Sequence, residues 1–291
     1  MKKIYILLLI VLGMFFITGM NTKSFASSEY ALYNQYCPKP PYNIASEGKR
    51  NFQRKTGLNA LAAKVAAGRI KKEIKKNAKG KFQVKVNSYS MTDARQGKFK
   101  SFEVKGKKII TSDVYISKVN AKTTCKFIHL DVENNPIKLI EPMAIDFNAE
   151  ISEDDLNKTL QTPAYQNYTI GIKRRMVKIS FFEFSNSRVS LKNNEFNFSA
   201  DVKTLMGRPF TANVVSKLKI ENNQIVLENF KFGSTNHKID GKKMKYLLNI
   251  FDPIHYMQKK LRQCNCKTIL KSVKIEDGNI IISGSAFLGK S

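Results

Sequence analysis

Few residues of this chain have the types and spacing that catalysis requires. The three histidines, His129, His237 and His255, each stand alone in their segment, and a lone histidine is more often structural than a base or a ligand. The acidic run at 153–155 lies where a helix is expected to begin, and helix capping accounts for it. No Gly-x-Ser-x-Gly, His-Glu-x-x-His or phosphate-binding glycine loop occurs. The sequence therefore gives no positive case for an enzyme, although scattered residues can still assemble a site.

Four cysteines, Cys37, Cys125, Cys264 and Cys266, are the other residues with chemical potential. An even number is typical of disulfides in an exported chain, and the N-terminus predicts export. Cys264 and Cys266 are too close in sequence to favour pairing with each other, so each is expected to have a distant partner. We predict that Cys125 pairs with Cys264 or with Cys266. A zinc site is the alternative, and it lacks a histidine or second cysteine pair at ligand spacing.

The first 26 residues have the order of a secretory signal peptide. Lys2 and Lys3 precede an apolar run over 4–20, and small residues stand at −3 and −1 of a cut after Ala26. An uncleaved membrane anchor is the alternative, because the run is near the shortest length that spans a bilayer. No later run is long and apolar enough, so the remainder is expected to be soluble. These patterns predict export to the periplasm or cell envelope.

The exported chain would be strongly basic. The full sequence has a net charge of +27, and removal of the signal with its three lysines leaves +24. A charge of this size favours anionic partners, which outside the cell are lipid head groups or acidic wall polymers. Nucleic acid is not an expected partner there. The alternative is that the lysines only keep the protein soluble.

A basic run between two predicted strands, Lys173, Arg174 and Arg175, is the candidate contact for a head-group phosphate. A solvated turn is the alternative interpretation of the same residues. The sequence alone does not choose between the two.

Hydrophobic periodicity predicts long strands and a few helices. Apolar residues at helical spacing indicate helices over 55–77 and 244–261, and a short helix begins at Ser152. Two blocks, 82–151 and 168–232, are predicted to be strands. Asparagine-containing turns at 186–187, 193–194 and 222–223 divide the second block. From Phe210 to Ile220 apolar and polar residues alternate for roughly 35 Å, about twice an ordinary strand, which gives a strand with one apolar face.

A lead segment precedes these helices and strands, and a hairpin follows them. The lead segment 27–51 contains three prolines and no period, and it is expected to be irregular. Residues 269–287 predict a hairpin, because Asp277-Gly278 is a turn between alternating apolar runs. The predicted organisation is a signal peptide over 1–26, the lead segment over 27–51 and one α+β domain over 52–291.

The order of these elements resembles the LmeA-like phospholipid-binding family of bacterial envelope proteins. The similar features span roughly residues 55–287 and include a basic amphipathic helix that leads into the strand KFQVKV at 81–86. AEISEDDLN at 149–157 is similar to that family's a-x-l-t-e-x-d-l-n stretch. LKSVKIEDGNIIISG at 270–284 is similar to its terminal v-x-v-x-d-G-x-l-x-i-x-G hairpin. A helix broken at Asp252-Pro253 precedes that hairpin.

The resemblance implies a long, curled antiparallel sheet wrapped around amphipathic helices, like half of a tubular lipid-binding module. An apolar groove between sheet and helices would accept acyl chains, without catalysis and without a cofactor. The candidate groove residues are Phe196, Phe198, Phe210, Val214, Leu218, Leu248 and Phe251. The alternative is that these side chains only pack on one another.

Two other functions stay open on the residues alone. One is a basic envelope scaffold or adaptor that binds acidic wall polymer or another protein by charge. The other is a hydrolase that acts on a lipid or glycan phosphate, which would need acids, histidines or lysines gathered in one cleft.

Overall fold

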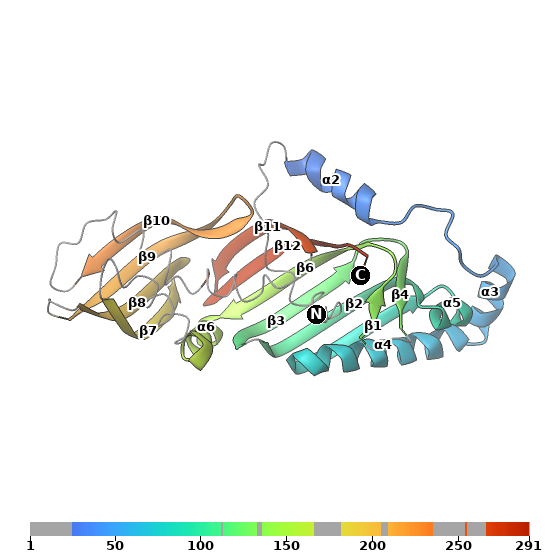
Figure 1. Ribbon diagram of the computed structural model, residues 1–291, viewed down its shortest axis with the longest axis horizontal. Coiled ribbons are helices and arrows are strands. Elements are labelled where there is room, and N and C mark those ends of the chain that lie inside the picture. Colours follow the sequence, from blue (N-terminus) through green and yellow to red (C-terminus); the bar gives the residue numbers. More distant parts are fainter. Residues whose placement is uncertain are drawn as a thin grey trace.

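The structure, a computed structural model, describes residues 25–111, 113–132, 136–165, 182–204, 209–234, 254 and 266–290. Two antiparallel sheets lie end to end in an elongated molecule, and helices flank the larger one (Figure 1). The helices are α2 (Phe25–Tyr36), α3 (Glu47–Lys55), α4 (Leu58–Asn77), α5 (Met91–Arg95) and α6 (Glu153–Leu160). The strands of the large sheet are β1 (Lys79–Ser88), β2 (Lys98–Thr111), β3 (Val114–Thr123), β4 (Ile128–Asp131), β5 (Lys138–Leu139), β6 (Met143–Ser152), β11 (Cys266–Glu276) and β12 (Asn279–Leu288). Those of the small sheet are β7 (Phe182–Lys192), β8 (Glu195–Thr204), β9 (Phe210–Glu221) and β10 (Gln224–Ser234). The predicted α+β class is confirmed.

The large sheet has the strand order β11-β12-β6-β3-β2-β4-β5, and β1 pairs with β2. The predicted C-terminal hairpin is β11–β12, and its turn residues Asp277 and Gly278 have φ of 49° and 71°, which aspartate and glycine tolerate. β12 then pairs with β6, where Gly284 lies opposite Phe147. A Cβ on Gly284 would stand 2.8 Å from Cζ of Phe147 and 2.4 Å from the carbonyl oxygen of Ile269. Glycine therefore lets this ring lie against the sheet.

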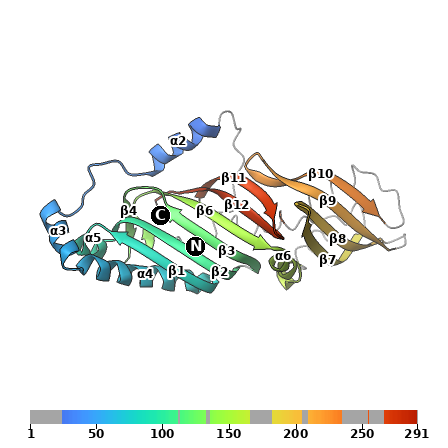
Figure 2. The same ribbon diagram turned by 180° about the vertical axis from the view of Figure 1, so that it is seen from behind.

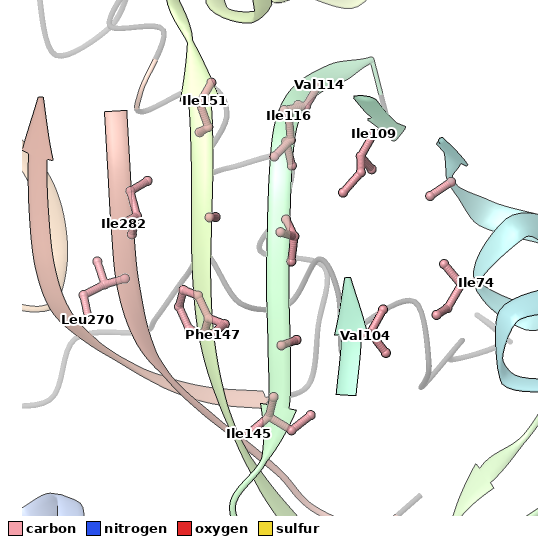
Figure 3. Packing of buried hydrophobic residues seen from close by; sticks show 14 of the residues in the cluster. Ile74, Val104, Ile109, Val114, Ile116, Ile145, Phe147, Ile151, Leu270 and Ile282 are labelled. Atoms are coloured by element: carbon pink, nitrogen blue, oxygen red, sulfur yellow. The ribbon is translucent and has the colours of Figure 1, made fainter. Parts of the chain in front are cut away.

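The core lies on one face of the large sheet, and α4 packs against its strand β1 (Figure 3). Ile74 of α4 faces Val104, and the same layer continues through Phe147 of β6 to Ile282 of β12. Because alternate residues of a strand point to opposite faces, the long runs in β2, β3 and β6 give this face an unbroken apolar surface. Ile254, in helical backbone within the predicted helix 244–261, is buried in the same cluster. The other residues of that helix lie outside the described ranges.

The first predicted helix, over 55–77, corresponds to α4, and the preceding α3 was not predicted. Gly57 separates the two helices, and its φ of 74° is a left-handed conformation that favours glycine. α3 ends before it and α4 begins after it. The lead segment, expected to be irregular, contains α2 and the start of α3. Short helices of this kind are held by tertiary contacts more than by their own periodicity, so the apolar pattern did not indicate them.

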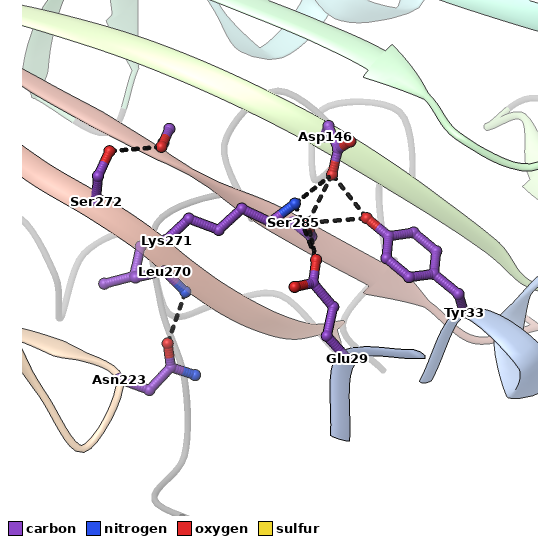
Figure 4. A network of polar contacts seen from close by, with 9 residues as sticks. Glu29, Tyr33, Asp146, Asn223, Leu270, Lys271, Ser272 and Ser285 are labelled. Atoms are coloured by element: carbon purple, nitrogen blue, oxygen red, sulfur yellow. Dashed lines mark hydrogen bonds and ion pairs between the residues drawn. The ribbon is translucent and has the colours of Figure 1, made fainter. Parts of the chain in front are cut away.

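α2 is fixed to the other face of the large sheet by its tyrosines and by Glu29 (Figure 4). The Tyr33 hydroxyl donates to Asp146 of β6 at 2.8 Å, and its ring lies edge-on to Phe287 with centroids 5.1 Å apart. Glu29 forms a 2.8 Å ion pair with Lys271. Burial opposes the charge of Lys271, but its bonds to Glu29 and Asp146 raise its pKa above the ordinary value. In both views α2 and α4 lie on opposite sides of this sheet (Figures 1 and 2).

The disulfide pairing differs from the prediction. Cys37, directly after α2, bonds to Cys125 across 88 residues, so Cys125 pairs with neither Cys264 nor Cys266. The pairing follows from space and not from sequence, because the loop after β3 meets the end of α2. Cys266 is itself disulfide-bonded, and Cys264 lies outside the described residues.

The small sheet has the order β10-β9-β8-β7. Its turns at Asn193-Asn194 and Asn222-Asn223 are as predicted, and all four residues have positive φ between 48° and 59°. The third predicted turn, at 186–187, is wrong. β7 runs through it, and the register shifts between Ser185 and Arg188, so the positive φ of Asn186 belongs to a bulge.

Two asparagine side chains join the small sheet to the rest. Asn157 of α6 donates to the carbonyl of Val189 and accepts from its N–H, both at 2.8 Å. Asn223 does the same for β11, donating to the carbonyl of Thr268 and accepting from the N–H of Leu270, both at 2.7 Å (Figure 4). Each amide takes the place of a neighbouring strand, since it offers one donor and one acceptor.

Candidate functional site

One face of the small sheet gathers five of the predicted groove residues. Phe198 lies opposite Val214, and Val202 lies opposite Phe210, so their side chains share a face. Phe196, Phe198, Phe210 and Val214 are buried, and Leu218 is half-buried on the same side of β9. Leu248 and Phe251 lie outside the described residues. The strands thus bring together the residues that alternation predicted, while their role as a groove stays a prediction.

This apolar face continues into the core of the large sheet. Val189 and Phe196 belong to the same buried cluster as Phe147 and Leu270. At the far end of the small sheet a second cluster contains Val202, Phe210 and Ala212, with Phe232 beside it. We call the buried apolar side of both sheets, from the core face of β1–β6, β11 and β12 to the buried face of β7–β10, the apolar seam. It runs along both sheets.

The opposite face of the small sheet is polar. Lys203, Asn213 and Lys217 are exposed there. Asp201 accepts hydrogen bonds from Asn186 at 2.8 Å and from Thr211 at 2.9 Å, and these bonds lower its pKa. The apolar side chains of this sheet therefore lie on the seam side, and its polar side chains lie on the other. The predicted head-group contacts Lys173, Arg174 and Arg175 lie outside the described residues.

An open pocket of about 450 Å³ lies between α4 and the edge strand β1. Its walls are Ala60, Ala63 and Ala67 on the helix and Val84 and Val86 on the strand, with Lys64, Lys85, Asn59, Asn87 and Ser88 around them. The alanine side chains are too short to fill the space between helix and strand. The volume is within the range of small-molecule sites, and apolar walls beside two lysines suit an anionic amphiphile.

Sequence reasoning missed this pocket. Of the alanines in α4, only Ala66 is buried. The signal was the spacing of Ala60, Ala63 and Ala67, which continues at steps of three and four to Ile70 and Ile74. The first half of the packing face therefore carries only short side chains. Asn59 donates from Nδ2 to the carbonyl of Tyr89 at 3.1 Å, while its buried Oδ1 has no hydrogen-bond partner among the described residues.

The described residues contain no group of three or more metal-ligating side chains. The acidic run at 153–155 was attributed to capping, and Ser152 does cap α6 by accepting from the N–H of Asp155 at 3.1 Å. Glu153 has a further role, because its carboxylate accepts from the N–H of Leu191 at 2.8 Å and helps to hold β7. Asp154 pairs with Lys158 on the surface. The acidic residues at 153–155 therefore take part in the cap of α6, in the attachment of β7 and in a surface ion pair.

Long one-sided strands whose apolar faces are buried together define the class of the protein, an α+β fold with one extended apolar interior. No helix within the described ranges has the length and apolarity needed to cross a membrane. The chain belongs to the LmeA-like phospholipid-binding family, whose family model matches residues 57–285. The resemblance seen in the sequence is thereby confirmed. Comparisons with curated proteins and with solved structures gave no match.

Proposed function

We propose that this protein is exported to the cell envelope and binds phospholipid, or another acyl lipid, without catalysis. The observation that carries the proposal is the apolar seam, which is continuous from the large sheet to the small one. The phospholipid-binding family supports the class of ligand. The signal-like N-terminus supports export.

The energetics of burial suffice for this function. Each methylene removed from water contributes about 0.8 kcal/mol. Ten methylenes held in the seam would give about 8 kcal/mol, which corresponds to a micromolar Kd. The lysines near the ligand would add attraction for a phosphate.

The second candidate function is a basic scaffold that binds acidic wall polymer or another protein by charge. The net charge of +24 after removal of the signal favours it. The salt dependence of binding distinguishes the two candidate functions. Salt screens attraction between exposed charges, but it does not weaken the hold on a buried acyl chain. Binding that disappears at high salt supports the scaffold, and a ligand retained at high salt supports the lipid carrier.

The test is native mass spectrometry of the protein purified from a secreting host, in low and in high salt, with uptake of fluorescent phospholipid as a second readout. Two neighbouring substitutions on β9 locate the site. Ala212→Phe places a ring in the seam, because Ala212 is buried, whereas Asn213→Phe places it on the polar face.

We expect bound lipid in the parent protein and in Asn213→Phe, and reduced lipid in Ala212→Phe. Thermal unfolding of each variant shows whether it is folded. A parent protein that carries no lipid and takes up no fluorescent phospholipid would contradict the proposal whatever the variants do.

A further inference from the structure

The outer side of α4 exposes large apolar residues. Leu61 is 59% exposed and Val65 is 55% exposed. The helix packs on the sheet through its opposite side, where Ile70 and Ile74 are fully buried. Phe52 of the adjoining helix α3 is 63% exposed. These three side chains therefore contribute nothing to the core that the structure describes.

Five of the exposed residues of α4 form one line along the helix. Leu61, Val65, Gly68, Lys72 and Lys75 follow each other at steps of four, three, four and three residues, and all five are exposed. Residues at this spacing share one helix face. We call this line the outer stripe. Its first half is apolar and its second half is cationic, and at Gly68 a side chain would meet only open space.

The outer stripe lies in a strongly basic environment. Residues 47–77 contain ten lysines and arginines against two acids, Glu47 and Glu73. Glu73 is already paired with Lys76 at 2.7 Å. Lys72 and Lys75 have no acidic partner among the described residues, so their charges are available to a partner.

The position of α4 makes this face accessible. In both views α4 forms one long margin of the molecule, and no described element lies outside it (Figures 1 and 2). The helix is 20 residues long, or about 30 Å at the rise of an α-helix. Lys64, beside the outer stripe, also lines the pocket between α4 and β1, so the pocket opens next to the stripe.

We propose that the outer stripe of α4 docks on the surface of a bilayer that contains anionic phospholipid. Leu61 and Val65 enter the boundary between head groups and acyl chains, and Lys72 and Lys75 bind lipid phosphates. An apolar strip flanked by lysines is the pattern of helices that lie in the membrane interface. A second copy of this chain does not fit the surface, because it would bring two strongly cationic helices together.

The docking proposal builds on the proposed function, since a bilayer is the natural source of a bound phospholipid, yet the two can fail separately. Native mass spectrometry reports lipid held inside the protein. Docking is measured separately, by a fluorescent reporter placed on α4. A protein that carries lipid but does not dock overturns only the present inference.

The chain has no tryptophan, so a single one introduced by substitution is an unambiguous reporter. Leu61→Trp places it in the outer stripe, at an exposed position. Asn213→Trp places the matched control on the exposed polar face of the small sheet. Each protein is mixed with vesicles of phosphatidylcholine alone or with phosphatidylglycerol added. We expect the emission of Leu61→Trp to shift to the blue only on the anionic vesicles, and that of Asn213→Trp to stay unchanged.

The charge requirement is tested in the Leu61→Trp protein. Lys72→Gln with Lys75→Gln should raise the lipid concentration at half-maximal shift by roughly 30-fold, from about 1 kcal/mol per lysine. Lys203→Gln with Lys217→Gln removes the same charge from the small sheet and should leave the lipid concentration at half-maximal shift unchanged. Because the reporter is on α4, attachment of the protein through its N-terminus does not by itself move the emission.

Four outcomes would overturn the docking proposal. The Leu61→Trp emission does not shift on anionic vesicles, or it shifts equally without phosphatidylglycerol. It shifts with protein concentration alone, which means that a second copy covers the stripe. Or the two paired charge removals weaken binding equally, which means that total charge and not this helix decides.

Discussion

His129 in β4 is a half-buried histidine beside an aromatic ring and a lysine. Its ring centroid is 6.1 Å from that of Phe127. Burial, and then the charge of Lys98, lower the pKa of His129 below its ordinary value of 6.5, although the nearby acids Asp131 and Glu141 oppose this. The folded state therefore favours the neutral imidazole, and the unfolded chain binds a proton at higher pH than the native protein does.

Because folding lowers the pKa of His129, we expect this residue to make the protein less stable in acid. Stability is full above the unfolded pKa, falls as the pH drops through about 6.5, and levels off below the folded pKa. His129→Gln removes the titration, so its unfolding midpoint in urea should depend less on pH over this window. Equal pH dependence in the parent and in His129→Gln would contradict the assignment.

At the scale of residues the sequence predicted roles that depend on local pattern. Alternation along β8 and β9 was enough to place Phe198 and Val214 on one buried face. It could not reveal that Glu153 accepts a bond from Leu191, because that partner is 38 residues away. A side chain that caps its own helix and one that holds a distant strand have the same local sequence.

At the scale of elements the hairpin β9–β10 is attached to β11 by Asn223. This residue is 9% exposed, has a φ of 59°, and makes two hydrogen bonds of 2.7 Å to the backbone of β11. Its neighbour Asn222 has a similar φ of 48° and is exposed. The two asparagines form the same turn but only one of them joins the sheets.

Substitution by glycine separates these roles, because glycine accepts the positive φ at both positions. Asn223→Gly should destabilise the protein by about 1–3 kcal/mol, since it leaves two buried backbone groups of β11 without partners. Asn222→Gly should change stability by only a few tenths of a kcal/mol, the usual effect at a surface site. Urea unfolding of the two variants measures the difference, and equal losses would show that Asn223 serves only the turn.

Elements were predictable where their signal is local. The Asn-Asn and Asp-Gly turns require positive φ within the turn itself, and the structure has them. The turn expected at 186–187 has the same residue type, but pairing with β8 continues on both sides of it. α2 was missed for the related reason that Tyr33 and Cys37 hold it through contacts remote in sequence.

At the scale of the whole molecule the Cys37–Cys125 bond ties α2 to the end of β3 and encloses α3, α4 and α5, with β1 to β3, in one covalent loop. Four cysteines allow three pairings, and the spacing argument that favoured Cys125 with Cys264 or Cys266 was wrong because pairing depends on the folded arrangement. The same limit applies to the pocket at α4 and β1, since a cavity depends on how closely two elements approach.

Replacing both cysteines, Cys37→Ser with Cys125→Ser, should lower stability by about 2–4 kcal/mol, because the unfolded chain gains the entropy of an open loop. Limited proteolysis should then cut within α2 sooner than in the parent protein. Tyr30→Ala is the matched control on α2, since Tyr30 is 72% exposed, and it should change neither measurement. A double variant as stable and as resistant as the parent would show that Tyr33 and Glu29 hold α2 without the bond.

The two asparagine joints have a mechanical consequence. In the part of the chain that is described, Asn157 and Asn223 connect the sheets by side-chain bonds, and no strand of one sheet pairs with a strand of the other. Such a connection can break and re-form without unzipping any β ladder. A bend at this junction would break side-chain hydrogen bonds and local packing only, and it would open the seam at the place where it passes from one sheet to the other (Figure 1).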